Sequence, residues 1–231
     1  MFLSADFERV VSGLGLIAVN SMRCPDQWVG DVKCTPDGFE YIGSDSGKFN
    51  FRMNLDRVSK RIVEEKVLLI ILESPHIDEY KKLSNSIFEP IGPANGVTGE
   101  NIRKYLHLAT KEIAIDNCCR QDLYHLFLVN AVPYQCSLGE VLVGSNKDNR
   151  NSIFLNCWNY AKHDFVERIN KYCSNNSIII NACTKGVNSP NDEFTLRGVV
   201  NRMVSAMNLN NKYYKRYHPA SLPNWKSERS W

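Results

Sequence analysis

Residues 67–76 read Val-Leu-Leu-Ile-Ile-Leu-Glu-Ser-Pro-His, six consecutive apolar side chains followed by an abrupt change to polar ones. The apolar part does not alternate with polar positions, which is typical of a strand buried on both faces of a parallel sheet. Pro75 fixes φ and lacks a backbone donor, so the strand should end before it. The stretch therefore predicts a central strand at 67–72, with Glu73 at its carboxyl end.

Three further strands alternate with helices along the rest of the chain. Segments at about 124–132, 177–182 and 213–217 are short and largely apolar or aromatic, as strands are. Between them, apolar side chains recur every three or four residues, which predicts helices. These positions are Ile102, Tyr105, Leu106, Ala109 and Ile113, then Phe154, Trp158, Ala161, Phe165 and Ile169, then Leu196, Val199, Val200, Met203, Val204 and Met207. The order predicts an α/β fold with three layers, α/β/α, around a central four-stranded parallel sheet.

The chain of 231 residues shows no linker, so we expect one domain with a core at 61–231 and an N-terminal extension at 1–60. In the extension, the apolar pattern from Phe2 to Ile17 suggests a helix. Phe39–Ile42 and Lys48–Phe51 flank a Gly-Ser-Asp-Ser-Gly turn, which suggests a hairpin.

Composition excludes several classes of protein. With 43% hydrophobic and 23% charged residues, the chain is neither disordered nor fibrous. The net charge of +3 permits a nucleic-acid partner without requiring one. No apolar run approaches the roughly 20 residues of a membrane-spanning helix, and the N-terminus lacks the layout of a signal peptide. We therefore expect a cytoplasmic monomer that does not bind membranes.

The eight cysteines contain no Cys-x-x-Cys pair. In a reducing compartment most of them are expected to be small buried apolar residues. No cofactor or metal is expected, although ligands for a metal or an iron–sulfur cluster could still converge from distant positions.

Polar side chains follow all four predicted strands. Because the carboxyl ends of parallel strands lie at one edge of the sheet, they are expected to surround a common site. These residues are Glu73, Ser74, His76, Asn130, Tyr134, Asn181, Thr184, Lys185, His218 and Ser221. Structural roles stay open for several of them: Glu73 could be a solvated turn residue, Asn130 a turn cap and His218 a packed turn histidine.

Four of these segments together resemble motifs of the uracil-DNA glycosylase superfamily. Leu72–His76 is similar to the Gly-Glu-Ala-Pro-Gly motif of its thermophile-type branch, and Pro93–Gly99 is similar to Pro-Phe-Val-Gly-x-Ala-Gly. Leu128–Val132 resembles the strand whose asparagine reads the extruded base, and His218–Ser221 resembles the motif His-Pro-Ser-Pro. The resemblance covers about 67–224.

The sequence also departs from that pattern. Leu72 stands where the branch has glycine, and Ser74 stands where members have alanine or aspartate. Ala94 replaces the phenylalanine that stacks on uracil, and the cysteine spacing lacks the iron–sulfur pattern of the branch. The Ala94 difference motivates the hypothesis that the target is bulkier than uracil, for instance glucosylated hydroxymethylcytosine in phage DNA, with a role in anti-phage defence.

The resemblance implies a DNA glycosylase that extrudes a pyrimidine base, hydrolyses its N-glycosidic bond and leaves an abasic site. In that reading Glu73 stabilises the sugar cation or orients water, His218 donates a hydrogen bond to the base carbonyl, and Asn130 reads the base edge. The other expected base contacts are Ser74, Pro75, His76, Ala94 and Asn95. The expected DNA contacts are Gly96, Gly99, Lys185, Lys215, Arg216 and Ser221, and 222–225 could form a wedge.

Two other functions remain open. A catalytically silent DNA-binding module with the same fold would bind DNA without releasing a base. A nucleotide hydrolase of unrelated α/β type could use the same strand ends, although the sequence lacks the usual phosphate-binding glycine motifs.

Overall fold

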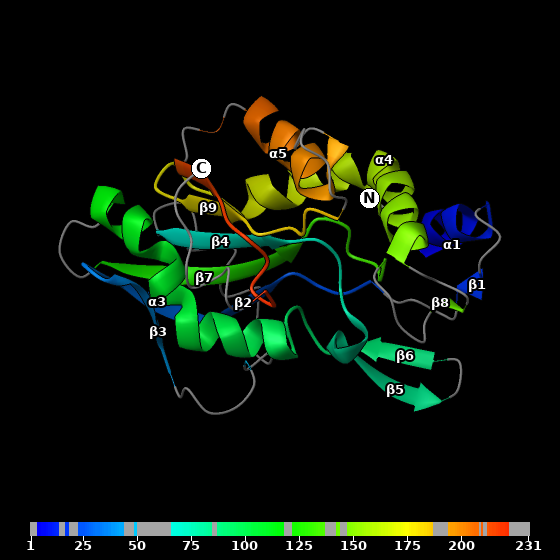
Figure 1. The fold of residues 1–231 in the computed structure, drawn as a ribbon, viewed down its shortest axis with the longest axis horizontal. Helices are drawn as coiled ribbons and strands as arrows, with labels where there is room; N and C mark the ends of the chain where they lie inside the picture. The colour runs from blue at the N-terminus through cyan, green and yellow to red at the C-terminus, as the bar shows by residue number, and fades with distance from the viewer. Residues whose placement is uncertain are drawn as a thin grey trace.

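The computed structural model describes residues 4–13, 17–18, 23–43, 49, 66–84, 87–117, 122–136, 142–143, 147–186, 194–207, 209 and 212–221. Its centre is a six-stranded sheet in the order β10-β9-β4-β7-β2-β3 (Figure 1). The strands are β2 (Gln27–Thr35), β3 (Gly38–Ile42), β4 (Val67–Leu72), β7 (Leu123–Asn130), β9 (Ile178–Asn181) and β10 (Lys212–Lys215).

The four predicted strands are present and form one parallel block, in which β4 pairs with β7 and β9, and β9 pairs with β10. The prediction of a four-stranded sheet is wrong in its count. β2 adds to β7 in the antiparallel sense, and β3 adds to β2 in the same way. The sheet is therefore mixed, with the parallel block at one side.

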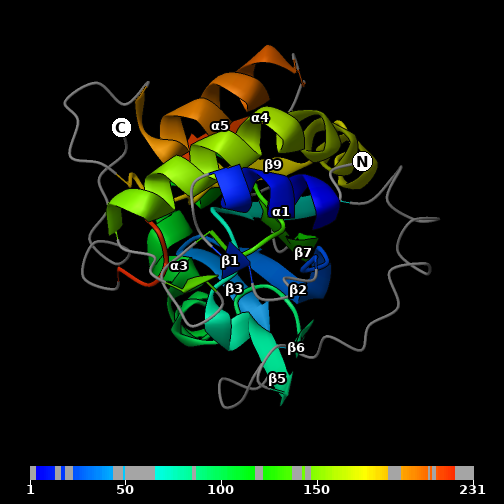
Figure 2. The ribbon, with the colours of Figure 1, turned by 90° about the vertical axis from the view of Figure 1, so that its right-hand side faces the viewer.

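Helices cover both faces of this sheet, which confirms the three layers. The helices are α1 (Ser4–Gly13), α3 (Val97–Asn117), α4 (Lys147–Tyr172) and α5 (Leu196–Ala206). Figure 2 shows α1, α4 and α5 on one side of the sheet and α3 on the other. Every residue of β4 is buried: Leu69 and Ile71 pack in the apolar cluster under α4, whereas Leu68 and Ile70 pack in the cluster under α3. This two-sided burial explains the unbroken apolar run.

The described part of 1–60 is more closely tied to the core than an extension would be. β2 lies between β7 and β3, so 27–42 belong to the central sheet. The predicted N-terminal helix ends at Gly13, and Ile17 instead lies in a short strand, β1 (Ile17–Ala18), paired with β8 (Leu142–Val143). The described partner of β3 is β2; of its predicted hairpin partner, 48–51, only Phe49 is described.

A second hairpin was not predicted. After the short 3-10 helix η1 (Ile77–Glu79), β5 (Tyr80–Ser84) and β6 (Ile87–Pro90) pair and project away from the central sheet (Figure 1). Tyr80 of β5 and Phe88 of β6 pack with Cys24 in a small apolar cluster, which anchors the hairpin to the rest of the protein. The strands are short, and β5 exposes its lysines and Leu83, so the sequence carries no apolar alternation there.

The turn before α3 brings two backbone segments into close contact. A Cβ added to Gly99 would lie 1.9 Å from the carbonyl oxygen of Ala94, so only glycine fits there. Ala94 itself has a φ of 57°, in the left-handed region that L-residues other than glycine rarely adopt. Gly99 thus serves the packing of this turn.

The cysteines differ in state. Cys34 is disulfide-bonded, which departs from the expectation of reduced thiols at that position. Five others in the described part of the chain are free, and four of these, all except Cys173, are buried, as expected. Among the described residues, no helix is both long and apolar enough to cross a bilayer.

Candidate active site at the carboxyl ends of the parallel strands

A pocket of about 430 Å³ opens where β4, β9 and β10 end, between the beginnings of α3 and α4. Its volume lies within the range of small-molecule sites, roughly 300–1,000 Å³. The residues that line it are Leu72, Glu73, Ser74, His76, Asp78, Glu79, Gly96, Val97, Thr98, Arg150, Thr184, His218 and Ala220. Residues from the ends of three of the four parallel strands therefore line one pocket, with Glu73 and His218 among them, whereas none from the end of β7 does.

Glu73 directly follows β4 and is 4% exposed. Its backbone carbonyl accepts the N–H of Val132, which fixes the turn, while its Oε1 is buried and makes no hydrogen bond to the described residues. Burial raises the pKa of this carboxyl to about 7, and the positive charge of Arg150 partly opposes that rise. Glu73 is therefore not a solvated turn residue: it is a buried acid in the pocket wall that titrates near neutral pH.

His218 lies just beyond β10 and is partly buried. Its Nδ1 accepts the backbone N–H of Ala220 at 3.2 Å, and its carbonyl accepts the N–H of Ser221. Burial, with the positive charges of Arg150 and His76, lowers the pKa of the imidazole to about 4, so the ring is neutral at pH 7. Since Nδ1 is an acceptor, the proton of the neutral ring sits on Nε2, which can donate a hydrogen bond.

Glu79 is a second buried carboxyl of the pocket, and sequence reasoning missed it. It is 4% exposed and accepts backbone N–H groups of Ala94 and His76 and the side-chain amide of Asn130, whose Nδ2 lies 3.5 Å from its Oε2. Burial outweighs these bonds and raises its pKa to about 8. The carboxyl thus ties together three segments of the site. The sequence could have indicated Glu79 through its position six residues after Glu73, in the segment that follows the same strand.

The stability that Glu79 contributes to the folded protein should fall as the pH rises from about 5 to 8. Glu79 has a folded pKa of about 8, above the ordinary 4.5, so the folded state holds a proton that the unfolded state loses. Replacing Glu79 with glutamine should remove part of this dependence, on the order of 3 kcal/mol between pH 5 and pH 8. Urea unfolding at both pH values measures it. A Glu167→Gln variant, on the exposed side of α4, is the control and should keep the full dependence. An unchanged dependence in Glu79→Gln would contradict the assignment.

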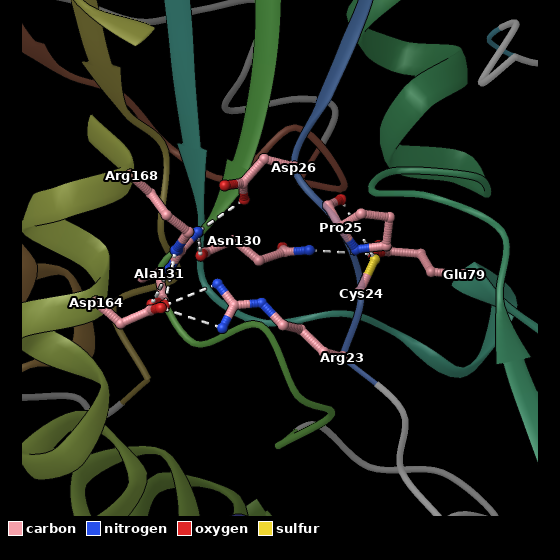
Figure 3. A network of polar contacts seen from close by, with 9 residues as sticks. All are labelled: Arg23, Cys24, Pro25, Asp26, Glu79, Asn130, Ala131, Asp164 and Arg168. Atoms are coloured by element: carbon pink, nitrogen blue, oxygen red, sulfur yellow. Dashed lines mark hydrogen bonds and ion pairs between the residues drawn. The ribbon is translucent and has the colours of Figure 1, made fainter. Parts of the chain in front are cut away.

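Asn130 ends β7 but does not line the pocket. It is 1% exposed, and its side chain points toward Cys24 and Glu79 (Figure 3). Its Oδ1 is buried without a hydrogen bond to the described residues. The structure therefore brings Asn130 next to the site, behind Glu79, and not to the surface where a base would lie.

A buried ionic network holds this end of β7 in place (Figure 3). Arg168 of α4 pairs with Asp26 at 2.7 Å and with Asp164 at 2.9 Å, and it donates to the carbonyls of Asn130 and Ala131. Arg23 adds a bidentate pair with Asp164. The guanidinium of Arg168 therefore links a helix, the segment before β2 and the loop after β7.

The remaining expected base contacts divide into two groups. Ser74 and His76 line the pocket. Pro75 is buried beside them, and Asn95 donates from Nδ2 to the carbonyl of Asp78 at 2.7 Å, outside the lining. Ala94 is 1% exposed within the apolar cluster under α3, so its small side chain does not widen this pocket, contrary to expectation.

The expected DNA contacts are also divided. Gly96 lines the pocket, Ser221 is exposed, and Lys185 and Lys215 are partly buried outside the lining. Arg216 is wrong as a phosphate contact: it is 3% exposed, and its Nε donates to the carbonyl of Ala109 at 2.8 Å. It packs β10 against α3. The segment 222–225 lies outside the described residues.

Two other strand-end residues are structural. Asn181 is fully buried, and its Nδ2 donates to the carbonyl of Arg197 and the hydroxyl of Tyr213. Tyr134 stacks on Phe7 of α1, with ring centroids 5.1 Å apart. Both side chains thus connect elements of the core, and neither lines the pocket.

No protein-family model, curated protein or solved structure matches the chain. Any assignment of function therefore rests on the residues of the pocket.

Proposed function

We propose that the chain is a DNA glycosylase that receives an extruded pyrimidine nucleotide in this pocket and hydrolyses the bond between base and sugar. One observation carries the proposal: an acid that titrates near neutral pH, Glu73, and a neutral imidazole donor, His218, line the same pocket. We further propose that it acts as a cytoplasmic monomer on DNA.

The two groups match the charges that develop in the reaction. The bond between C1′ and the base nitrogen breaks, its electron pair leaves with the base, and the oxygen of a water molecule bonds to C1′. Ionised Glu73 stabilises the positive sugar and accepts a proton from that water. The Nε2–H of His218 stabilises the negative charge on the base oxygen without giving up its proton.

The volume of the pocket bears on which pyrimidine base it accepts. A volume of about 430 Å³ falls in the range of sites that hold drug-sized ligands, so the pocket has room for a modified pyrimidine as well as for uracil. Glucosylated hydroxymethylcytosine, as in phage DNA, is the substrate that we propose, with a role in defence. This extension rests on volume, since Ala94 does not contribute to the lining.

Abasic-site formation across a panel of oligonucleotides tests the proposal. The panel carries uracil, hydroxymethylcytosine, its glucosylated form and ordinary cytosine, in single and double strands, and alkali cleavage reveals base loss. We expect cleavage at the glucosylated base. Cleavage confined to uracil would remove the bulky target but keep the glycosylase, binding without base loss would indicate a silent module, and turnover of free nucleotides alone would indicate a hydrolase.

The rate of base release should rise with pH and level off above about 7. Glu73 acts as a carboxylate, and with a pKa of about 7 it becomes protonated and inactive below that pH. His218, with a pKa of about 4, stays neutral between pH 5 and 9 and adds no inflection. Measuring kcat/KM over this range tests the prediction, with Glu79→Gln expected to keep the inflection near pH 7. A flat profile in the parent protein would exclude Glu73 as the titrating group.

A further inference from the structure

Arg150 is a cation of the pocket that the two catalytic roles do not use. It lies in the first turns of α4 and is partly buried. Its Nε and Nη2 donate to Oδ1 of Asn151 at 3.4 and 3.3 Å, and Nη2 also reaches the carbonyl of Gly186. These neutral contacts hold the guanidinium in place. Within the described residues, Arg150 forms no ion pair with a carboxylate, and its Nη1 makes no hydrogen bond.

Such an arginine favours a bound anion. Moving a guanidinium partly out of water is costly unless an opposite charge compensates, and its planar fork suits the oxygens of a phosphate. The imidazole of His76, which also lines the pocket, is half-exposed and lies beside Asp78, with Nδ1 3.2 Å from Oδ2. Among the described residues, Arg150 thus forms no ion pair, although its charge reaches Glu73 and partly opposes the rise in the pKa of that carboxyl.

Two further sources of hydrogen-bond donors border the same pocket. Thr184 lines the pocket, and its hydroxyl is buried and makes no hydrogen bond to the described residues. Across the pocket, Gly96, Val97 and Thr98 form the beginning of α3, a helix of 21 residues whose first N–H groups carry partial positive charge. Donors therefore reach the pocket from both faces of the sheet.

We propose that Arg150 and Thr184 bind a phosphate group of the substrate nucleotide and so hold its sugar between Glu73 and His218. This inference rests on the proposed function for the identity of the substrate, but phosphate binding itself does not require base release. The phosphate belongs either to the DNA strand or to a free nucleotide, and the chemistry of recognition is the same for both.

The DNA arm uses a duplex that carries one stable abasic-site analogue, so no catalysis is needed. The dissociation constant is measured between 50 and 200 mM salt for the parent protein, Arg150→Gln, Arg150→Lys and Lys111→Gln. Lys111 is exposed on α3 outside the pocket, and replacing it with glutamine removes one positive charge, as Arg150→Gln does. We expect Arg150→Gln to bind about tenfold more weakly, with the salt slope smaller by about 0.9. Arg150→Lys should keep the slope, and Lys111→Gln should match the parent.

The nucleotide arm compares deoxyuridine 5′-monophosphate with deoxyuridine by calorimetry. If the phosphate site accepts a free nucleotide, the parent protein binds the monophosphate about tenfold more tightly, and Arg150→Gln abolishes the difference. A loss in either arm supports the phosphate site and identifies its source. Unchanged affinity and salt slope in both arms overturn it, even if the parent protein releases bases; absence of base release with a loss in one arm overturns the glycosylase proposal instead.

Discussion

Replacing Glu73 with glutamine is expected to lower the rate of base release about 10³-fold while leaving the fold intact. Glutamine keeps the shape of the side chain but cannot carry the negative charge that the sugar cation needs. The fold should tolerate the change, because Glu73 is 4% exposed and its raised pKa shows that burial disfavours the charge. Single-turnover measurement of abasic sites on the cleaved substrate gives the rate.

The control for this change is Glu167→Gln, which removes a carboxylate from the exposed side of α4 and should release bases at the parental rate. DNA affinity of Glu73→Gln should stay within about threefold of the parent, since the contact acts in the transition state. If the Glu73→Gln protein released bases as fast as the parent, the catalytic role proposed for Glu73 would be wrong. The fold and the proposed phosphate site would be unaffected by that result.

Replacing Arg168 with methionine is expected to destabilise the protein by about 3–5 kcal/mol. The change leaves Asp26, 6% exposed, without its ion pair, and leaves Asp164, 5% exposed, paired with Arg23 alone. It also removes two donors from the carbonyls of Asn130 and Ala131. Charges left unpaired inside a protein cost far more than the pair itself contributes. Urea unfolding at pH 7 measures the loss.

Arg9→Met is the matched control for that experiment. Arg9 pairs with Asp6 at 3.1 Å on the surface of α1, where the arginine side chain is 65% exposed. Loss of an exposed pair should cost less than about 1 kcal/mol. Equal losses in the two variants would mean that the network around Arg168 contributes nothing beyond a surface ion pair.

The parallel half of the fold could be predicted because its signals are local. β4 is buried on both faces, so all six of its residues are apolar, and α4 shows its buried stripe from Phe154 to Ile169. β2 was missed because its residues alternate only roughly and include Asp31 and Lys33. Its position beside β7 is set by pairing with residues about 95 positions away, which no local pattern reports.

The site could be predicted only as far as strand ends determine it. Glu73 follows β4 directly and His218 comes three residues after β10, and parallel topology then places both at one edge. Arg150 comes from a helix and Glu79 from a 3-10 turn, so their arrival in the pocket depends on how those elements pack. Asn130 is the last residue of its strand, yet β7 lies next to the antiparallel β2, and no residue at the end of β7 lines the pocket.

The place of β2 in the sheet bears on where the chain can be shortened. A fragment that starts at residue 61 would leave the hydrogen-bonding edge of β7 uncovered, together with the fully buried Leu126 and Leu128. Bare edges of this kind recruit strands from other molecules, so such a fragment should aggregate. The smallest unit worth expressing therefore includes Arg23 and Asp26, whose charges meet α4 far along the chain.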